Sequence, residues 1–422
     1  MGAEASASIG LMETTMWLLG SICSATAAGF YVQVSHQLGS NDPARARSTL
    51  RQGIISVLVV SALLGLVSLA VSPFLPTWLG GNSHITPTAS AYFAIVATAL
   101  PIFQFSIFGA GMLRSSGNMV VPSVMSVVMM SLDVVFNFFL IFPTRPVELF
   151  GTQIMMPGMG MGVMGAAIGT VSAELVAASI TMYILCFRSK ELSLRIDTGR
   201  FLPTWGVVKR ALHISLPMGL QQTIMCSAYV MTTIIIAPLG TFAIAANSFG
   251  IIIESLCYMP GYGIADAATT LVGQSMGAGR HELMKRFAWL SVGLGVTVMA
   301  VMGVVMYVGA PTAMAMMTPA EEVRRLGVEV LRIEAFAEPM FAAAIVSYGV
   351  FVGAAKTLVP SIMNLISIWG VRISLAAMLA PSMGLRGVWI AMCIELCFRG
   401  LIFLVKLKFW NIQTSCKHYG KD

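Results

Sequence analysis

The sequence predicts an all-α polytopic membrane protein made of two related helical lobes, and three observations carry this prediction. First, 57% of the 422 residues are hydrophobic and only 10% are charged, whereas soluble domains carry about 25% charged residues. Second, the apolar residues stand in long uninterrupted runs. Third, glycines and prolines recur at a fixed offset of 238 residues between the two halves. This composition argues against a soluble enzyme.

Eleven apolar runs are each long enough to cross a bilayer as a helix, which takes about 20 residues. A membrane β-barrel would show alternating segments of about ten residues instead. In chain order the runs lie at residues 5–36, 52–76, 89–112, 118–143, 161–187, 209–236, 241–275, 287–309, 323–352, 357–381 and 384–407. We expect no cleavable signal peptide, because Met1 lacks a basic flank and the first run is too long.

Lys and Arg orient the predicted helices, because these residues collect on the cytoplasmic side of a membrane. Of the 25 Lys and Arg residues, 18 fall in the loops and ends of one side. Three more lie within predicted spans, and the other side holds only Arg145, Arg324, Arg325 and Arg386. We therefore expect a multi-pass protein of the bacterial cytoplasmic membrane with its C-terminus in the cytoplasm. The same asymmetry explains the net charge of +7 without a nucleic-acid partner.

The offset of 238 residues indicates an internal repeat. Matching positions are Gly39 and Gly277, Pro101 and Pro339, Gly111 and Gly349, and the Val-Pro-Ser sequences at 121–123 and 359–361. The first half carries about 16 extra residues, which we place in a loop near Pro146 to Met159. A repeat unit of six helices is even, so the two lobes should be parallel and related by an axis along the membrane normal.

The repeat register divides the chain into four parts. We expect an N-terminal lobe of five helices at 1–187, a cytoplasmic linker at 188–208, a C-terminal lobe of six helices at 209–408 and a cytoplasmic tail at 409–422. Met1 aligns with Leu239, just after the helix that opens the second repeat. The first repeat is therefore expected to be one helix short.

Several motifs resemble the multidrug and toxic compound extrusion (MATE) family. The most specific is Val-Gly-Gln-x-x-Gly-Ala-Gly at 272–279, and others are Ala-Pro-Leu-Gly at 237–240, Ala-Ala-Asn at 245–247, Pro-Gly-Tyr-Gly at 260–263, Trp-Gly-Val-Arg at 369–372, Gly-Val-Trp-Ile-Ala at 387–391 and Arg-Gly-Leu-Ile-Phe-Leu at 399–404. The resemblance covers essentially the whole chain. It implies a fold of twelve helices in two six-helix lobes, and export of organic cations in exchange for H⁺ or Na⁺.

The chain departs from the family pattern at three places. It is expected to lack the first helix, which carries the coupling Asp of the N-terminal lobe in one branch of the family. In a second branch the seventh helix has a Glu where this chain has Met225, and the tenth helix has an acid at about Phe341. The resemblance therefore implies the family fold for this chain, whereas its coupling residues have to be identified from its own ionisable residues.

Ten ionisable residues inside the predicted spans are the first functional candidates, because a charge at bilayer depth costs about 2.5–3.5 kcal/mol. Seven acids face three bases: Asp133, Glu174, Glu254, Asp266, Glu334, Glu338 and Glu395 against Arg332, Arg372 and Arg399. Carboxyl groups that carry a proton or hold a cation would account for this excess. An ion-coupled antiporter needs both abilities.

Four residues are the candidates for ion coupling or substrate binding. Glu338 lies mid-span directly before Pro339, which bends the helix; the alternative is a structural pair with Arg372 or Arg332. The other three are Asp133 and Asn137, which share a helix face at i and i+4, and Glu254, which is central in its span. The resemblance supports Asn137 directly and Asp133 less well.

Glu395 and Arg399 are expected to form a structural ion pair, because they stand four residues apart on a helix in the favourable order. A cavity for cations of varied shape suits soft Met and aromatic walls. The candidates for that wall are Tyr258, Met259, Tyr262 and Trp369.

The seven cysteines predict neither disulfides nor a metal site, because none has metal-ligand spacing with His and all but Cys416 lie in apolar stretches. We expect no cofactor; H⁺ or Na⁺ would be the coupling ion. The expected partners are the lipid bilayer and small organic cations, and the expected state is a monomer.

The leading hypothesis is a secondary antiporter that exports cationic amphiphilic drugs or metabolites by alternating access. One alternative is a flippase for a lipid-linked saccharide, which would favour a cavity rich in Arg and Lys, and the excess of acids counts against it. A second is an inactive fragment that has lost its first helix. An intramembrane enzyme is not expected, because no paired His, Cys or Asp-rich motif supplies a metal or a nucleophile.

Overall fold

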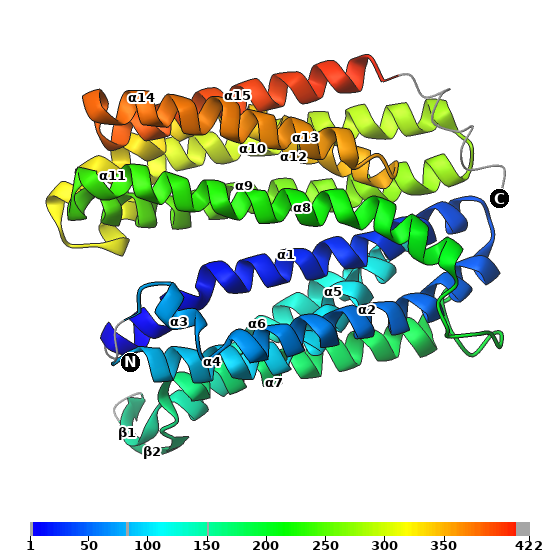
Figure 1. Ribbon diagram of the computed structural model, residues 1–422, viewed down its shortest axis with the longest axis horizontal. Helices are drawn as coiled ribbons and strands as arrows, with labels where there is room; N and C mark the ends of the chain where they lie inside the picture. Colours follow the sequence, from blue (N-terminus) through cyan, green and yellow to red (C-terminus); the bar gives the residue numbers. More distant parts are fainter. Residues whose placement is uncertain (1–2, 82–83, 150–151, 411–422) are drawn as a thin grey trace. The chain divides into compact units, whose positions relative to one another are not determined.

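The computed structural model describes residues 3–81, 84–149 and 152–410, and these residues are almost entirely helical (Figure 1). Nine of the described helices are long and apolar enough to cross a membrane. Two further spans arise if each of two bent helix pairs crosses as one unit, which gives up to eleven. The predicted all-α membrane fold is therefore confirmed. The part of the predicted tail from 411 to 422 lies outside the described residues.

The chain divides into two compact units, with the boundary along the sequence between Gly219 and Leu220. The first unit holds α1 (Ala3–Gly39), α2 (Pro43–Val71), α3 (Leu75–Trp78), α4 (Thr86–Thr98), α5 (Leu100–Ser115), α6 (Val120–Ile141), β1 (Pro143–Leu149), β2 (Thr152–Met159), α7 (Gly162–Tyr183) and a π-helical turn η1 (Ile184–Arg188). It also includes the linker and the first half of α8 (Trp205–Ile236).

The second unit begins with the remainder of α8. It continues through η2 (Ala237–Leu239), α9 (Thr241–Gly277), α10 (His281–Met317), α11 (Glu321–Glu334), α12 (Glu338–Gly353), α13 (Leu358–Ile366), a π-helical stretch η3 (Ser367–Ile373), α14 (Ser374–Met383) and α15 (Leu385–Lys408). Each unit has its own apolar core, and Trp389 is the largest fully buried side chain of the second. Its indole N–H donates to Asn247 Oδ1 at 3.0 Å.

The internal repeat is visible in the helix boundaries. Adding 238 to the bounds of α1 gives those of α9, and adding 238 to the bounds of α5 gives those of α12. Both repeats bend before the second helix of the pair, by 47° between α4 and α5 and by 58° between α11 and α12. Pro101 and Pro339 stand in the first turn after each bend, where a proline lacks an N–H that the helix would leave unpaired.

A second repeat pair, Gly111 and Gly349, permits close helix packing. A Cβ at Gly349 would lie 2.6 Å from the carbonyl oxygen of Ala265 on α9, and a Cβ at Gly111 would meet the ring of Tyr31 on α1. Both glycines therefore let the bent helix approach the equivalent long helix of its own unit. This is the physical reason why these positions hold the repeat register.

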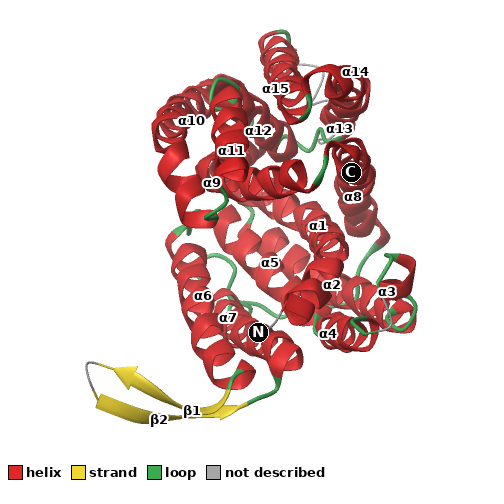
Figure 2. Ribbon diagram, turned by 90° about the vertical axis from the view of Figure 1, so that its left-hand side faces the viewer, coloured by secondary structure: helices red, strands yellow, loops and turns green. Residues whose placement is uncertain are grey.

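The extra residues of the first half, which we placed in a loop near Pro146 to Met159, form a β-hairpin. β1 and β2 pair antiparallel, from Pro143 opposite Met159 to Leu149 opposite Thr152. Figure 2 shows the two strands projecting beyond the ends of α6 and α7. The hairpin accounts for the difference in length between the repeats.

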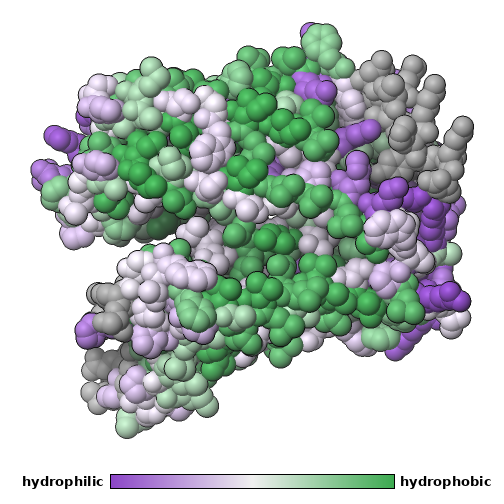
Figure 3. Space-filling model, viewed as in Figure 1, coloured by the Kyte–Doolittle hydropathy of each residue, from purple (hydrophilic) through white to green (hydrophobic). Residues whose placement is uncertain are grey.

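The outer faces of the helices are apolar. Figure 3 shows hydrophobic residues along the middle of the helices and hydrophilic residues gathered at their ends. Large side chains such as Leu66, Val127 and Val134 are more than 60% exposed. Continuous exposed apolar surface of this extent is expected where lipid covers a protein.

Candidate functional site

Four acidic side chains and one arginine are buried inside the second unit, and a second arginine, Arg372, is 13% exposed beside them. Glu254 lies on α9, Glu334 ends α11 and Glu338 begins α12, so the last two flank the 58° bend. The others are Glu395 and Arg399 on α15 and Arg372 on η3. Glu334, Glu338 and Glu395 are 0% exposed, and Glu254 is 6% exposed.

Glu395 is the carboxylate with a full set of partners. Arg399 Nε lies 2.8 Å from its Oε1 and Arg399 Nη2 lies 2.9 Å from its Oε2. Arg372 Nε approaches Oε2 at 3.2 Å, and the hydroxyl of Ser367 donates to Oε1 at 2.6 Å. The sequence suggested Arg399 as a partner; the structure adds Arg372 and Ser367, which the π-helical stretch η3 carries toward α15. Glu395 thus pairs with both arginines, and its single negative charge balances one of their two positive charges.

Glu334 and Glu338 have no such partners. All four of their carboxyl oxygens are buried and accept no hydrogen bond. The alternative pairing of Glu338 with an arginine is absent, because Arg372 pairs with Glu395 and the guanidinium of Arg332 lies 5.1 Å from the ring centre of Tyr307. A buried carboxylate without a donor is costly when charged. The bend between α11 and α12 is thus a place where a proton or a cation is favoured.

Glu254 joins this group through electrostatic interactions with Glu334 and Glu338 on one side and with Arg372 and Arg399 on the other. The sequence had identified Glu254 and Glu338 as candidates from their central positions. It had not separated Glu334 from the other intramembrane acids. The signal was present: Glu334 stands four residues before Glu338 in the same bent span.

Aromatic side chains lie beside the acids. Tyr258 packs edge-on against Phe341, with ring centres 5.6 Å apart, and Arg399 lies 5.6 Å from the centre of the Phe341 ring. Tyr258 also contacts Tyr262, at 5.7 Å between ring centres. These contacts connect two of the four predicted wall residues to the buried charges.

The other two predicted wall residues lie further out. Met259 is about half exposed, and Trp369 is 36% exposed with its indole N–H directed at the carbonyl oxygen of Ile224, 3.4 Å away. Next to Trp369, a small pocket of the second unit contains Arg372 in its wall. The full lining is Met225, Ala228, Tyr229, Thr232, Ile368 and Arg372.

The first unit holds a second polar group around Asp133 and Asn137 of α6. One oxygen of each side chain is buried and accepts no hydrogen bond. Asn137 lies against Gly169 of α7, where a Cβ would come within 2.4 Å of Asn137 Oδ1. Glu174 of α7 is 6% exposed, hydrogen-bonds Ser106 and interacts electrostatically with Asp133. The sequence alone could not show which side of α7 carries Glu174.

Within the described residues, no group of three or more His, Cys, Asp or Glu side chains is arranged to hold a metal ion. The described cysteines are all free, and Cys416 lies outside the described residues.

Comparison with known proteins places these features in a family context. The MatE family model matches residues 1–139 and 217–378. A probable multidrug resistance protein NorM of Thermotoga maritima is 24% identical over 407 residues, covering 95% of this chain and 84% of the relative. An FAD transporter of Shewanella oneidensis is 24% identical over 294 residues, covering 69% and 62%.

Solved structures share the fold. The outward-facing conformation of a multidrug resistance MATE family transporter of the MOP superfamily has a TM-score of 0.88 at 19% identity, covering 99% of this chain and 90% of the other. A MOP superfamily transporter from Pyrococcus furiosus, described as having reversed polarity of its binding pocket, has a TM-score of 0.86 at 19% identity, covering 96% and 88%.

Proposed function

The chain belongs to the MatE family of efflux transporters, and from this premise we propose that it is a secondary antiporter that exports cationic amphiphilic drugs or metabolites in exchange for H⁺ or Na⁺. The observation that carries the proposal is the bend between α11 and α12, where Glu334 and Glu338 are fully buried without hydrogen-bond donors. Such groups take up either a proton or a cation at little cost, because both remove the uncompensated charge.

Exchange follows from competition for this negative charge. When H⁺ or Na⁺ occupies the carboxyl groups, an organic cation loses its electrostatic partner and leaves. When the organic cation binds, it displaces the coupling ion. Glu254 lies within electrostatic range of both acids, so the three carboxyl groups act as one site whose occupancy is shared. Alternating access then requires that the site opens to one side of the membrane at a time.

A cationic substrate suits this site better than an anionic one. Arg372 and Arg399 both pair with Glu395, and the four acids of this group outnumber the two arginines. A flavin dinucleotide or a lipid-linked pyrophosphate would need free basic groups to replace its hydration. We therefore propose cation export for this chain in preference to FAD transport or the flipping of a lipid-linked saccharide.

The proposed setting is the cytoplasmic membrane of a bacterium, with the chain acting as a monomer. The loops that contain most of the Lys and Arg would face the cytoplasm. In this orientation the bend between α11 and α12 and the polar group around Asp133 both lie between the two membrane surfaces.

The test uses inverted membrane vesicles that contain the chain, acidified inside by respiration in Na⁺-free medium. Ethidium is added while a fluorescent amine reports the pH difference. Proton-coupled antiport predicts a partial collapse of that difference, and vesicles without the chain should show none. A Na⁺ gradient is tested in the same way if H⁺ gives no signal.

Variants connect the activity to the site. Glu334→Gln and Glu338→Gln should each abolish the ethidium-induced collapse, because the amide cannot exchange a proton. Glu282→Gln is the matched control, since Glu282 is an exposed acid in the first turn of α10 and should behave as wild type. Full coupling in both site variants, at equal amounts of inserted protein, would disprove the assignment of these residues.

A further inference from the structure

The linker between the two halves has a surface that neither the fold nor the proposed transport explains. Residues 189–204 connect the end of η1 at Arg188 to the start of α8 at Trp205. Both flanking helices belong to candidate membrane spans, Gly162–Arg188 and Trp205–Leu239. The linker is therefore tied at both ends to a membrane surface, with too few residues to extend far from it.

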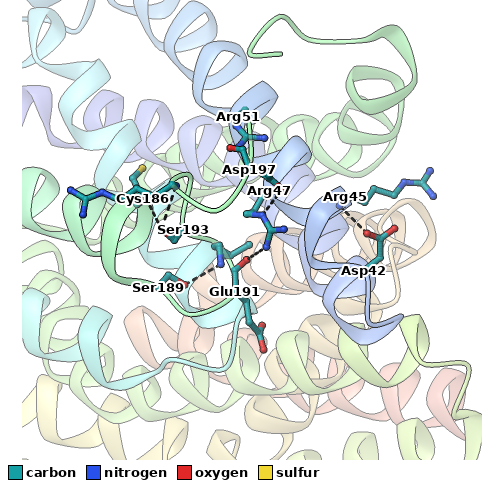
Figure 4. Close-up of polar contacts among 11 residues, drawn as sticks. Asp42, Arg45, Arg47, Arg51, Cys186, Ser189, Glu191, Ser193 and Asp197 are labelled. Atoms are coloured by element: carbon teal, nitrogen blue, oxygen red, sulfur yellow. Dashed lines mark hydrogen bonds and ion pairs between the residues drawn. The ribbon is translucent and has the colours of Figure 1, made fainter. Parts of the chain in front are cut away.

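Three side chains of α2 fix the linker in a defined conformation, and Figure 4 shows two of them, Arg47 and Arg51. Arg47 Nε lies 2.7 Å from Asp197 Oδ2, and its Nη1 donates to the carbonyl oxygen of Glu191 at 2.9 Å. Arg51 donates to both the carboxylate and the carbonyl oxygen of Asp197. At the other end Gln52 Oε1 accepts from the N–H and the hydroxyl of Thr204, at 2.8 and 2.9 Å.

The fixed linker exposes large apolar side chains. Leu202 is 74% exposed, Trp205 72% and Ile196 58%, and Phe201 adds a further exposed ring. A cluster of exposed apolar side chains on an ordered polar loop indicates an interaction surface, whereas single scattered apolar side chains do not. Trp in particular is enriched where a membrane meets water.

Basic side chains are interleaved with the apolar ones. Five are exposed: Arg188, Lys190, Arg195, Arg200 and Lys209. Only two acids occur between them, and Asp197 is already neutralised by Arg47 and Arg51. The surface therefore combines net positive charge with apolar anchors. The acyl interior of a bilayer would not accept the charges and water would not cover the anchors, whereas the headgroup region accepts both.

We propose that residues 188–209 form a membrane-surface element that binds anionic phospholipid, with Ile196, Leu202 and Trp205 set among the upper acyl chains and the five basic side chains on the headgroup phosphates. The linker conformation held by Arg47, Arg51 and Gln52 presents these two sets of side chains together. This inference depends on the chain being embedded in a membrane, and it is independent of which ion or substrate the chain transports.

The experiment places the full chain in vesicles of mixed phosphatidylcholine and phosphatidylglycerol and uses brominated lipid to quench tryptophan fluorescence. The difference between wild type and Trp205→Phe isolates the contribution of Trp205. At equal mole fractions, brominated phosphatidylglycerol should quench this contribution more strongly than brominated phosphatidylcholine. The excess should disappear at high ionic strength, because salt screens headgroup charge.

Each Lys or Arg near an anionic surface strengthens binding by about fivefold. Removing four of the five charges should therefore leave at most the roughly fivefold lipid preference that Lys209 alone contributes. The linker variant is R188Q/K190Q/R195Q/R200Q. The matched control removes three basic residues of the α9–α10 region and should keep the preference: R280Q/K285Q/R286Q.

Two results would overturn the proposal. One is equal quenching of Trp205 by both brominated lipids in the wild-type protein, which would leave an acidic protein as the remaining partner for the surface. The other is an unchanged preference in the linker variant. Equal elution of both variants in detergent shows that the charge changes leave the fold intact.

Discussion

Removing Arg399 should destabilise the second unit far more than removing a surface arginine at a similar distance from its partner. Arg399 supplies the contacts at 2.8 and 2.9 Å to Glu395, which is 0% exposed. Breaking a buried ion pair by removing one partner costs about 3–5 kcal/mol. Because Arg372 and Ser367 remain in place, we expect Arg399→Gln to fall at the lower end, about 3 kcal/mol.

The converse change should cost more. Glu395→Gln removes the buried carboxylate that pairs with both Arg372 and Arg399, so we expect a loss near 5 kcal/mol. Arg386→Gln is the matched control, since Arg386 Nε lies 2.6 Å from Glu329 Oε2 but Arg386 is half exposed. Exposed pairs contribute about 0–1 kcal/mol.

The free energy of unfolding would be measured by reversible titration from detergent into SDS micelles. The expected order of destabilisation is Glu395→Gln, then Arg399→Gln, then Arg386→Gln. An Arg399 variant no less stable than the Arg386 variant would refute the view that this network is a buried structural pair.

Two further predictions concern packing and pH. Gly349→Ala should lower the free energy of unfolding by about 1–3 kcal/mol, because its Cβ would overlap the carbonyl of Ala265. Gly293→Ala, where a Cβ meets nothing within 4 Å, should be neutral or stabilising. Equal free energies of unfolding in SDS for the two variants would contradict the packing argument. The arginine partners of Asp197 hold the pKa of its carboxyl below the usual range, so this attachment of the linker is present above about pH 3.9 and is lost as pH falls through the depressed pKa. The rate of amide hydrogen exchange at 189–204, corrected for the intrinsic rate, should stay constant from neutral pH to about pH 4. At neutral pH the exchange rate should be higher in Asp197→Asn than in wild type. A wild-type exchange rate that begins to rise near pH 5 would contradict this prediction.

Hydrophobic runs predicted most of the fold because lipid exposure imposes a strong and local constraint on sequence. They underestimated helices that extend beyond the bilayer. The run at 52–76 gave no sign that α2 begins at Pro43, because Arg45, Arg47 and Arg51 are helical but not apolar. The β-hairpin was also missed, since residues 143–159 contain three prolines and two glycines, a composition that is typical of a loop.

The sequence predicted a site residue only where a neighbouring residue in the chain marked its position. Glu338 stood out through the adjacent Pro339, which marks the bend. Arg399 was predicted as a partner of Glu395 from its spacing, but Arg372 and Ser367 were not. A π-helical stretch at 367–373 shifts the face that carries Arg372, and a regular helical period does not reveal this shift. The side to which Glu174 points depends in the same way on packing between helices, which the sequence of one helix does not contain.

The repeat itself supplies a test of whether the acids at the bend serve function rather than the fold. At the 238-residue offset, Glu334 corresponds to Val96 and Glu338 to Leu100, and both apolar partners are buried beside an equivalent bend of 47°. One repeat therefore builds the bend without carboxyl groups.

Burying an unpartnered polar group costs about 1–3 kcal/mol, so the variant E334V/E338L should be at least as stable as wild type in SDS unfolding. It should at the same time lose gradient-driven export completely, because no group at the bend exchanges an ion. The reciprocal variant V96E/L100E puts the same acids at the other bend and should lose stability. A decrease of more than about 1 kcal/mol in the free energy of unfolding of E334V/E338L would mean that the carboxyl groups have structural partners. That result would contradict the assignment of the bend between α11 and α12 as the coupling site.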